Sequence, residues 1–177
     1  MPMSSLSAQF SLRAVNDTAA AVALGNPSTA KTPYEIAGSL GWLNGTGSGA
    51  ADRVYAFSGT LASTTATIDL LGSLTDIYGA ALSFVEVRAI IIRNTSESAA
   101  KVLKLGGGSN PAFAGLFGAT GDILLIPAAG PTGLPFVWSA GYDGGGLVPV
   151  AGTGDILTLD SGAQTVTYEG IIVGVSA

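Results

Sequence analysis

The sequence predicts an all-β protein: an antiparallel β-sandwich, jelly-roll-like in plan, with an extended N-terminal arm. Three observations support this prediction. Stretches rich in β-branched and aromatic residues recur about every ten residues between turns rich in Gly and Pro, which is typical of sandwiches and barrels. Several stretches alternate apolar and polar residues with the period of two that a half-buried strand shows. Helix signals are weak, with a single short turn conceivable over 70–78.

The first expected strand lies in the N-terminal segment 1–43, where apolar and polar residues alternate from Ala8 to Ala14. The segment holds too little apolar material for a core of its own. We therefore expect an arm, or a set of extra strands, that packs on a partner or on a neighbouring subunit. Residues 44–50 are rich in Gly and predict a flexible hinge, and residues 51–177 form the expected sandwich domain.

The strongest strand signal in the sandwich domain is Phe84–Arg93. Its three consecutive isoleucines are apolar on both faces, so we expect a central strand that is covered on both sides. A short hairpin loop is expected at Ser161-Gly162. The other expected strands are 52–58, 61–70, 100–105, 123–126, 134–138, 147–150, 156–159 and 164–175.

The pentapeptide Thr-Gly-Asp-Ile-Leu occurs twice, at 120–124 and at 153–157. Five residues are too few to indicate a repeat architecture. We expect instead that two strands enter the sheet through similar turns. Aspartates beside glycine commonly accept hydrogen bonds from their own backbone in such turns, and this is the expected role of Asp122, Asp143, Asp155 and Asp160.

The composition removes most catalytic chemistry. The 177 residues include no Cys and no His, which excludes thiolate nucleophiles, a Ser-His-Asp triad and the commonest metal ligand. No phosphate-binding motif of the form G-x-x-x-x-G-K-[ST] occurs. We expect no enzyme activity, no cofactor and no metal site. A hydrolase that works through a pair of carboxylates and an adventitious calcium site at an Asp-containing turn remain as alternatives.

Charge and hydropathy restrict the partners. Residues 1–104 carry seven basic and seven acidic side chains, and residues 105–177 carry five acidic and no basic ones, which gives the net charge of −5. Clustered Lys and Arg bind phosphate backbones, so we expect no nucleic-acid partner. No apolar run approaches the ~20 residues of a membrane span. The 47% of hydrophobic residues therefore fill a β core or form surfaces that other subunits cover.

Large aromatic and basic residues are the candidates for a subunit interface. An indole beside a mobile linker needs something to pack against, which favours Trp42. The basic residues lie among acidic ones, so a solvated strand face is the alternative for them, and a place in the sandwich core is the alternative for the aromatic ones. The candidate residues are Phe10, Trp42, Arg88, Arg93, Trp138 and Tyr142.

Several short motifs between residues 44 and 174 resemble small virion structural proteins of tailed bacteriophages. They are Asn44-Gly45-Thr46-Gly47-x-Gly49-Ala50-x-Asp52-Arg53-Val54, Asp69-Leu70-x-Gly72-Ser73-Leu74-Thr75-Asp76, Phe84-x-x-Val87-x-Ala89-Ile90-x-Ile92-x-Asn94 and Val166-Thr167-Tyr168-Glu169-x-Ile171-Ile172-x-Gly174. The resemblance implies a β-sandwich made in the host cytoplasm that coats the virion as a capsid decoration, or cement, protein. It carries no catalytic residues.

A decoration protein implies two partners, the major capsid protein and copies of the chain itself. Threefold positions of an icosahedral shell favour a trimer. The acidic chain suits the outer surface of the capsid, because packaged DNA would repel it. The alternative is a tail or fibre module that binds host surface glycans through Trp138, Tyr142 and Asp143.

Overall fold

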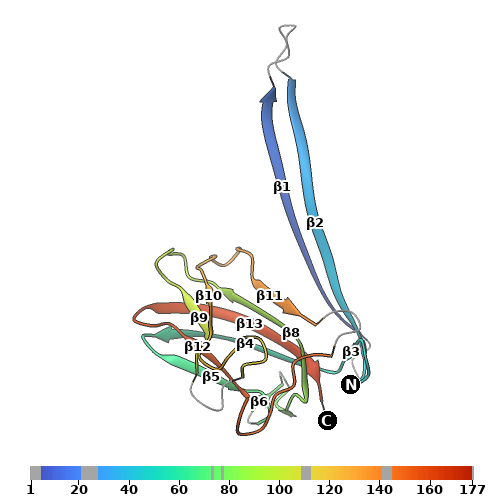
Figure 1. The fold of residues 1–177 in the computed structure, drawn as a ribbon, viewed down its shortest axis with the longest axis vertical. Helices are drawn as coiled ribbons and strands as arrows, with labels where there is room; N and C mark the ends of the chain where they lie inside the picture. Colours follow the sequence, from blue (N-terminus) through green and yellow to red (C-terminus); the bar gives the residue numbers. More distant parts are fainter. Residues whose placement is uncertain are drawn as a thin grey trace.

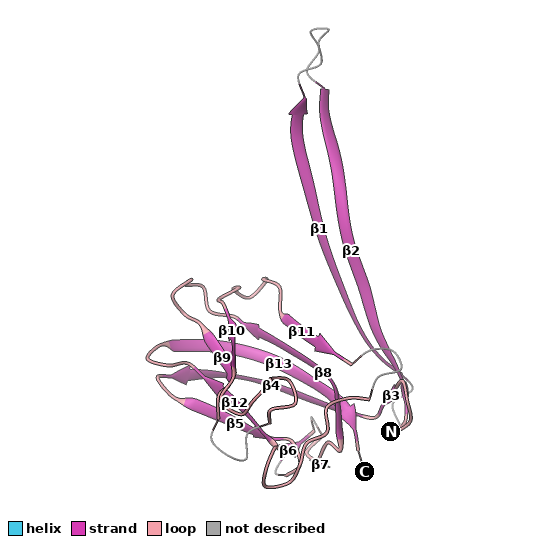
Figure 2. Cartoon of the chain, in the orientation of Figure 1, coloured by secondary structure: helices cyan, strands magenta, loops and turns pink. Residues whose placement is uncertain are grey.

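The computed structural model describes residues 5–20, 28–72, 74–76, 78–108, 113–140 and 145–176, with side chains from residue 41 onward. Every regular element in these segments is a strand (Figure 2), so the all-β prediction is confirmed. Two four-stranded antiparallel sheets form the sandwich. Sheet I has the order β11-β8-β13-β4, and its strands are β4 (Arg53–Ala62), β8 (Glu86–Asn94), β11 (Phe136–Ser139) and β13 (Thr165–Val175). Sheet II has the order β10-β9-β12-β5, and its strands are β5 (Thr65–Asp69), β9 (Leu103–Gly106), β10 (Ile123–Ile126) and β12 (Ile156–Asp160).

The strand connections follow the jelly-roll plan. Within sheet I, β4 pairs with β13 and β8 pairs with β11; within sheet II, β5 pairs with β12 and β9 pairs with β10. Along these eight strands the chain changes sheet at every connection except the one from β9 to β10, which stays within sheet II. Such an eight-strand double wrap is the arrangement predicted from the sequence.

The core lies between the two sheets. Its cluster of buried side chains includes Phe84, Ile90, Ile92, Leu105 and Leu157, all of them fully buried. The predicted strand over 84–93 is confirmed as β8, which lies inside sheet I between β11 and β13. The expected cover on both sides holds at Ala89 and Ile90, which point to opposite faces and are completely buried, but Ile91 on the outer face is only partly buried.

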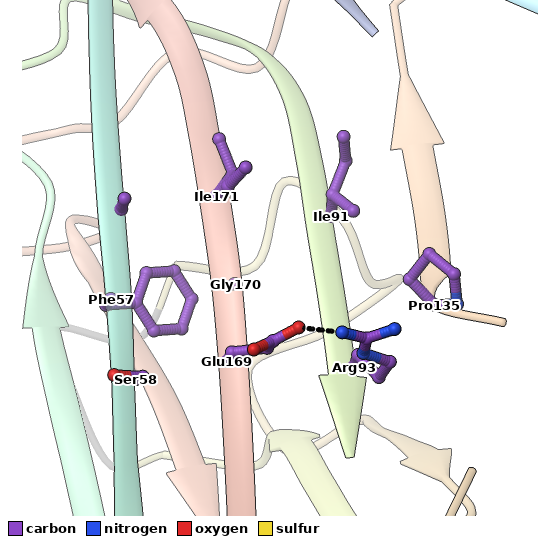
Figure 3. A pocket seen from close by; sticks show the side chains of 9 residues that line it. Phe57, Ser58, Ile91, Arg93, Pro135, Glu169, Gly170 and Ile171 are labelled. Carbon is purple, nitrogen blue, oxygen red and sulfur yellow. Dashed lines mark hydrogen bonds and ion pairs between the residues drawn. The ribbon is translucent and has the colours of Figure 1, made fainter. Parts of the chain in front are cut away.

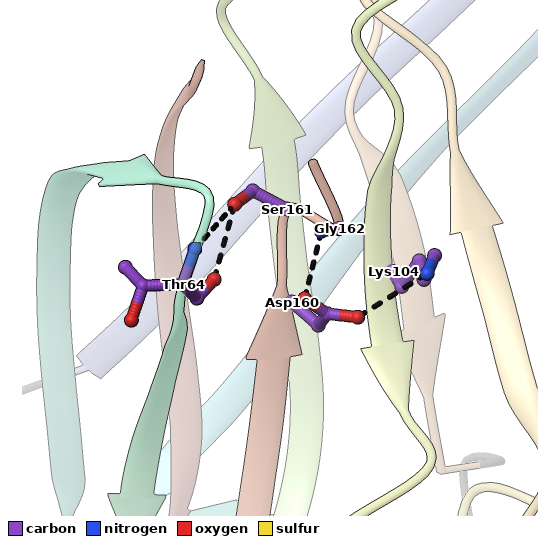
Figure 4. Close-up of polar contacts among 5 residues, drawn as sticks. All are labelled: Thr64, Lys104, Asp160, Ser161 and Gly162. Atoms are coloured by element: carbon purple, nitrogen blue, oxygen red, sulfur yellow. Dashed lines mark hydrogen bonds and ion pairs between the residues drawn. The ribbon is translucent and has the colours of Figure 1, made fainter. Parts of the chain in front are cut away.

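Two inter-sheet connections run side by side at one corner of the sandwich (Figure 4). The backbone N–H of Thr64 donates to Oγ of Ser161 at 3.1 Å, and that hydroxyl donates to the Thr64 carbonyl at 3.0 Å. Nearby, Asp160 accepts a hydrogen bond from the N–H of Gly162 at 2.7 Å and pairs with Lys104 at 3.3 Å. These contacts fix the crossing from β4 to β5 beside the crossing from β12 to β13.

The same corner corrects two expectations. The loop at Ser161-Gly162 is not a hairpin loop, because β12 and β13 belong to different sheets. The strand expected over 61–70 is broken into the end of β4 and β5, because Ser63 adopts a φ of 53° and turns the chain from one sheet to the other. Neither crossing has a local sequence pattern that distinguishes it from a hairpin.

A buried amide ties sheet I to sheet II. The side chain of Asn94 is completely buried at the end of β8. Its amide nitrogen donates to the carbonyls of Lys101 at 2.8 Å and Ile126 at 3.1 Å, and its amide oxygen accepts from the N–H of Ser96 at 3.1 Å. The amide thus joins the end of β8, the connection to β9 and the end of β10 through three satisfied hydrogen bonds.

The expectation for the repeated pentapeptide is confirmed. Asp122 precedes β10 and accepts a hydrogen bond from the N–H of Ala119 at 2.8 Å. Asp155 precedes β12 and accepts one from the N–H of Gly152 at 3.1 Å. In both cases the donor lies three residues before the aspartate, and the two strands flank β9 in sheet II.

Two further expectations are wrong. Residues 147–150 contribute isolated bridges in place of a strand, since Pro149 has no N–H to donate to a ladder. No helical turn forms in the described part of 70–78, where β6 (Leu74–Thr75) begins a small pair with β7 (Ala81–Leu82). Asp76 accepts the N–H groups of Tyr78 and Ala80, and this local turn competes with a helix.

The N-terminal arm is a two-stranded antiparallel ribbon. It consists of β1 (Ser5–Ala20) and β2 (Ser28–Asn44), which pair without interruption along the whole of β1. Figure 1 shows the ribbon leading away from the sandwich. At its base, β2 pairs in parallel with the short strand β3 (Ala50–Ala51). Among the described residues, no helix has the length and apolarity to cross a bilayer.

Candidate functional site

The outer face of sheet I, which points away from the core, is the candidate functional site. Side chains alternate across a strand, so every second residue of β4, β8, β11 and β13 lies on this face. A hollow of about 480 Å³ opens on it (Figure 3). The hollow is lined by Ala56, Phe57, Ser58, Ile91, Arg93, Pro135, Glu169, Gly170 and Ile171.

One end of the hollow carries an ion pair. Arg93 of β8 lies directly opposite Glu169 of β13, and the guanidinium contacts the carboxylate. The same guanidinium donates a second hydrogen bond to the carbonyl of Gly133 at 3.3 Å. The two charges cancel, so this end of the hollow is polar but has no net charge. Because the pair is partly exposed to water, we expect it to contribute little to stability.

A row of apolar residues crosses the sheet beside the ion pair. Val137 of β11 lies opposite Ile91 of β8, which lies opposite Ile171 of β13, which lies opposite Ala56 of β4. We call these four residues the apolar row. Ile171 is 40% exposed and Val137 is 36% exposed. Strand pairing therefore gathers β-branched side chains from three strands into one continuous strip that water reaches.

The next row of the same face is covered by the base of the ribbon. Trp42 at the end of β2 is only 8% exposed, and its side chain packs in a small cluster with Ala51, Ala89 and Val173. Ala89 lies opposite Val173 in the pairing of β8 with β13. The indole thus covers the row adjacent to the apolar row and attaches the ribbon to sheet I.

Arg88 holds the glycine-rich segment against β8. Its guanidinium pairs with Glu86 at 3.0 Å and donates to the carbonyl of Gly47 at 3.3 Å. Within the segment, the N–H of Ala50 donates to Gly47 at 3.1 Å, and the N–H of Leu43 donates to the carbonyl of Gly49. The expected hinge over 44–50 is a hydrogen-bonded turn in this structure, and its flexibility stays a prediction.

The candidate residues from the sequence lie in different places. Trp42 and Arg88 are buried by their own chain at the base of the ribbon, and Arg93 lines the hollow. Trp138 is half-buried and packs against the core, as the alternative interpretation of the aromatic residues expected. Phe10 lies opposite Gly38 in the ribbon, and its side chain is outside the described part.

Tyr142 and Asp143 lie outside the described residues. The apolar row was missed by sequence reasoning. Its only signal was that the isoleucines of β8 and of β13 are apolar on both faces, and the sequence does not say which face stays uncovered.

The outer face of sheet I presents apolar side chains and an ion pair. No group of three or more His, Cys, Asp or Glu side chains capable of holding a metal ion occurs in the described segments. Turn aspartates direct their carboxylates at backbone N–H groups, as the sequence predicted for three of the four named above. What the outer face of sheet I offers is an apolar strip bordered by a neutral ion pair, which suits a segment of another protein.

We compared the chain with known proteins and found no family model, no curated protein and no solved structure that matches it. The resemblance to phage virion proteins therefore stays a prediction.

Proposed function

We propose that the chain is a phage virion structural protein, a decoration protein that binds the outer surface of the capsid and stabilises it through subunit contacts. The observation that carries this proposal is the ribbon, because a long two-stranded extension from a compact jelly roll serves to reach a neighbour. Its partners would be the major capsid protein and further copies of the chain, in a trimer at threefold positions.

The ribbon needs a covering partner on physical grounds. Its strands are 16 and 17 residues long, which corresponds to a length of about 50 Å. An isolated two-stranded ribbon is only marginally stable in water, and its outer edges present unpaired backbone groups. Apart from the pairing with β3 at the base, no described strand pairs with either edge of the ribbon. A partner that covers it would supply the missing stabilisation.

The jelly roll and the charge support the same proposal. Jelly rolls occur in viral capsid proteins and in lectins, so the architecture permits a capsid role without requiring one. The net charge of −5 disfavours a position against packaged DNA and favours the outer surface. Lectin-like binding through Trp138 is less favoured, because that side chain packs against the core.

Deletion of the arm tests the proposal. The core cluster takes its buried residues from positions 61–172, so a chain without residues 1–43 should stay soluble and rich in β-structure. It should no longer co-sediment with purified capsids, whereas the full chain should. A Trp138→Ala chain serves as the comparison and should bind capsids normally. Undiminished capsid binding by the deleted chain would refute the role of the arm, and glycan binding that Trp138→Ala abolishes would favour the tail-module alternative.

A further inference from the structure

We infer that the ribbon of one copy of this chain packs on the apolar row of sheet I in a second copy. The inference names a self-association surface and does not depend on the capsid proposal. It rests on the pairing register of the ribbon, on the position of Trp42, and on the exposed apolar row next to it.

The register divides the ribbon into an apolar face and a polar face. Residues of equal parity along paired strands share a face. On one face, Leu6, Ala8, Phe10, Leu12 and Ala14 lie opposite Trp42, Leu40, Gly38, Ile36 and Tyr34. On the other face, Ser5, Ser7, Gln9, Ser11 and Arg13 lie opposite Leu43, Gly41, Ser39, Ala37 and Glu35. From Leu6 to Ala14 the first face is almost entirely apolar, so burying this part is favourable, whereas farther along the ribbon the same face carries polar residues such as Asn16 and Thr32.

Trp42 is an example of a residue of the apolar face that packs on the outer face of sheet I. It belongs to that face, and its side chain is buried against Ala89 and Val173 on the outer face of sheet I. The adjacent row of the same sheet face, which includes Ile91 and Ile171, is of the same chemical kind and is partly exposed. The surface that Trp42 covers is therefore continuous with the partly exposed apolar row, where the apolar face of another ribbon could pack.

The ribbon of the same copy does not supply that cover. Beyond its base it leads away from the sandwich (Figure 1), and within the described chain its only pairing outside the ribbon is with β3. The equivalent ribbon of a second copy carries the same apolar face. Its apolar part, from Leu6 to Ala14, is roughly 30 Å long, which exceeds the about 15 Å over which the apolar row crosses four neighbouring strands of sheet I.

Charge permits two copies to meet in this way. The chain is acidic overall, but its ribbon is neutral, because Arg13 lies opposite Glu35 and Asp17 lies opposite Lys31. The neutral pair of Arg93 and Glu169 lies in the row next to the apolar row of the receiving copy. Neither the ribbon nor the surroundings of the apolar row carry a net charge. The two surfaces therefore do not repel each other electrostatically, although the whole chain is acidic.

Complementation between two full-length variants tests the inference. Leu12→Asp changes the apolar face of the ribbon, and Ile171→Asp changes the apolar row. In analytical ultracentrifugation, we expect the unchanged chain to self-associate and each variant alone to associate at least about tenfold more weakly. A mixture of the two should regain association, because one copy keeps an intact ribbon and the other keeps an intact row.

Two control variants introduce an aspartate on surfaces that the proposed contact does not use. Ser11→Asp lies on the polar face of the ribbon, and Leu125→Asp lies on sheet II, where Leu125 is 56% exposed. Both should associate like the unchanged chain. Ile171→Thr, which keeps a β-branched residue, should weaken association if Ile171→Asp fails to fold. An unchanged chain that stays monomeric, a lack of effect of either apolar-face variant, or a mixture without recovery would each overturn the inference.

Discussion

Replacing Trp42 by Ala should release the base of the ribbon and leave the jelly roll folded. The indole is 8% exposed, so roughly 200 Å² of its surface is buried, which corresponds to about 5 kcal/mol at about 25 cal/mol per Å². Alanine retains part of this, and measured Trp→Ala costs in cores are about 3–5 kcal/mol. Trp42 belongs to a small cluster apart from the main core, so the loss should stay local.

Amide hydrogen exchange measures this effect residue by residue. The reporting amides are those of Leu43 and Ala50, which donate to carbonyls within the turn at the base of the ribbon. A loss of about 3–5 kcal/mol corresponds to exchange faster by a factor of about 10² to 10⁴ at these amides. Amides of β8 and β13 should be nearly unchanged, and Trp42→Phe should give a smaller effect. Equal acceleration throughout the sandwich, or none at Leu43, would refute the assignment of Trp42 as a local anchor.

Two further predictions concern the sandwich itself. Asn94→Asp should destabilise the fold by about 3–5 kcal/mol at neutral pH, because a buried carboxylate replaces an amide that donates two hydrogen bonds. Urea denaturation at decreasing pH should show this loss becoming smaller, because the carboxylate becomes protonated. If Asn94→Ala shows the same pH dependence, this explanation is wrong. Burial, and secondarily the charge of Tyr55, raise the pKa of Tyr168 above its ordinary value of 10.0. The unfolded chain therefore loses the phenol proton at a lower pH than the folded chain does. The free energy of unfolding falls as the pH rises from the unfolded pKa through the folded pKa. Tyr168→Phe should therefore lose less stability than the unchanged chain between about pH 8 and about pH 11 in urea melts; an equal loss would contradict it.

The sequence predicted the elements whose signals are local. Alternating and β-rich stretches identified the long strands of the sandwich, and aspartates beside glycine identified the turns before β10 and β12. The spacing of these strands predicted an antiparallel sandwich or barrel, of which the jelly roll is one plan. The expectation at 147–150 was wrong although the residues are apolar, because an apolar composition does not compensate for the missing N–H of a proline.

Features that depend on distant pairing were not predictable. Strand β2 contains Gly, Pro and Thr, so its extent is defined by its pairing with β1. The apolar row exists only because β4, β8, β11 and β13 meet in one particular register. For the same reason the sequence favoured Trp42 as a contact residue but did not show that its own chain covers most of it.

Electron cryomicroscopy of virions that contain the chain tests its adhesive role most directly. We expect many copies at regular positions on the outer surface of the capsid, each with its ribbon lying against a neighbouring subunit. Virions without the chain, or copies whose ribbon and outer sheet face both remain free of any neighbour, would contradict the account.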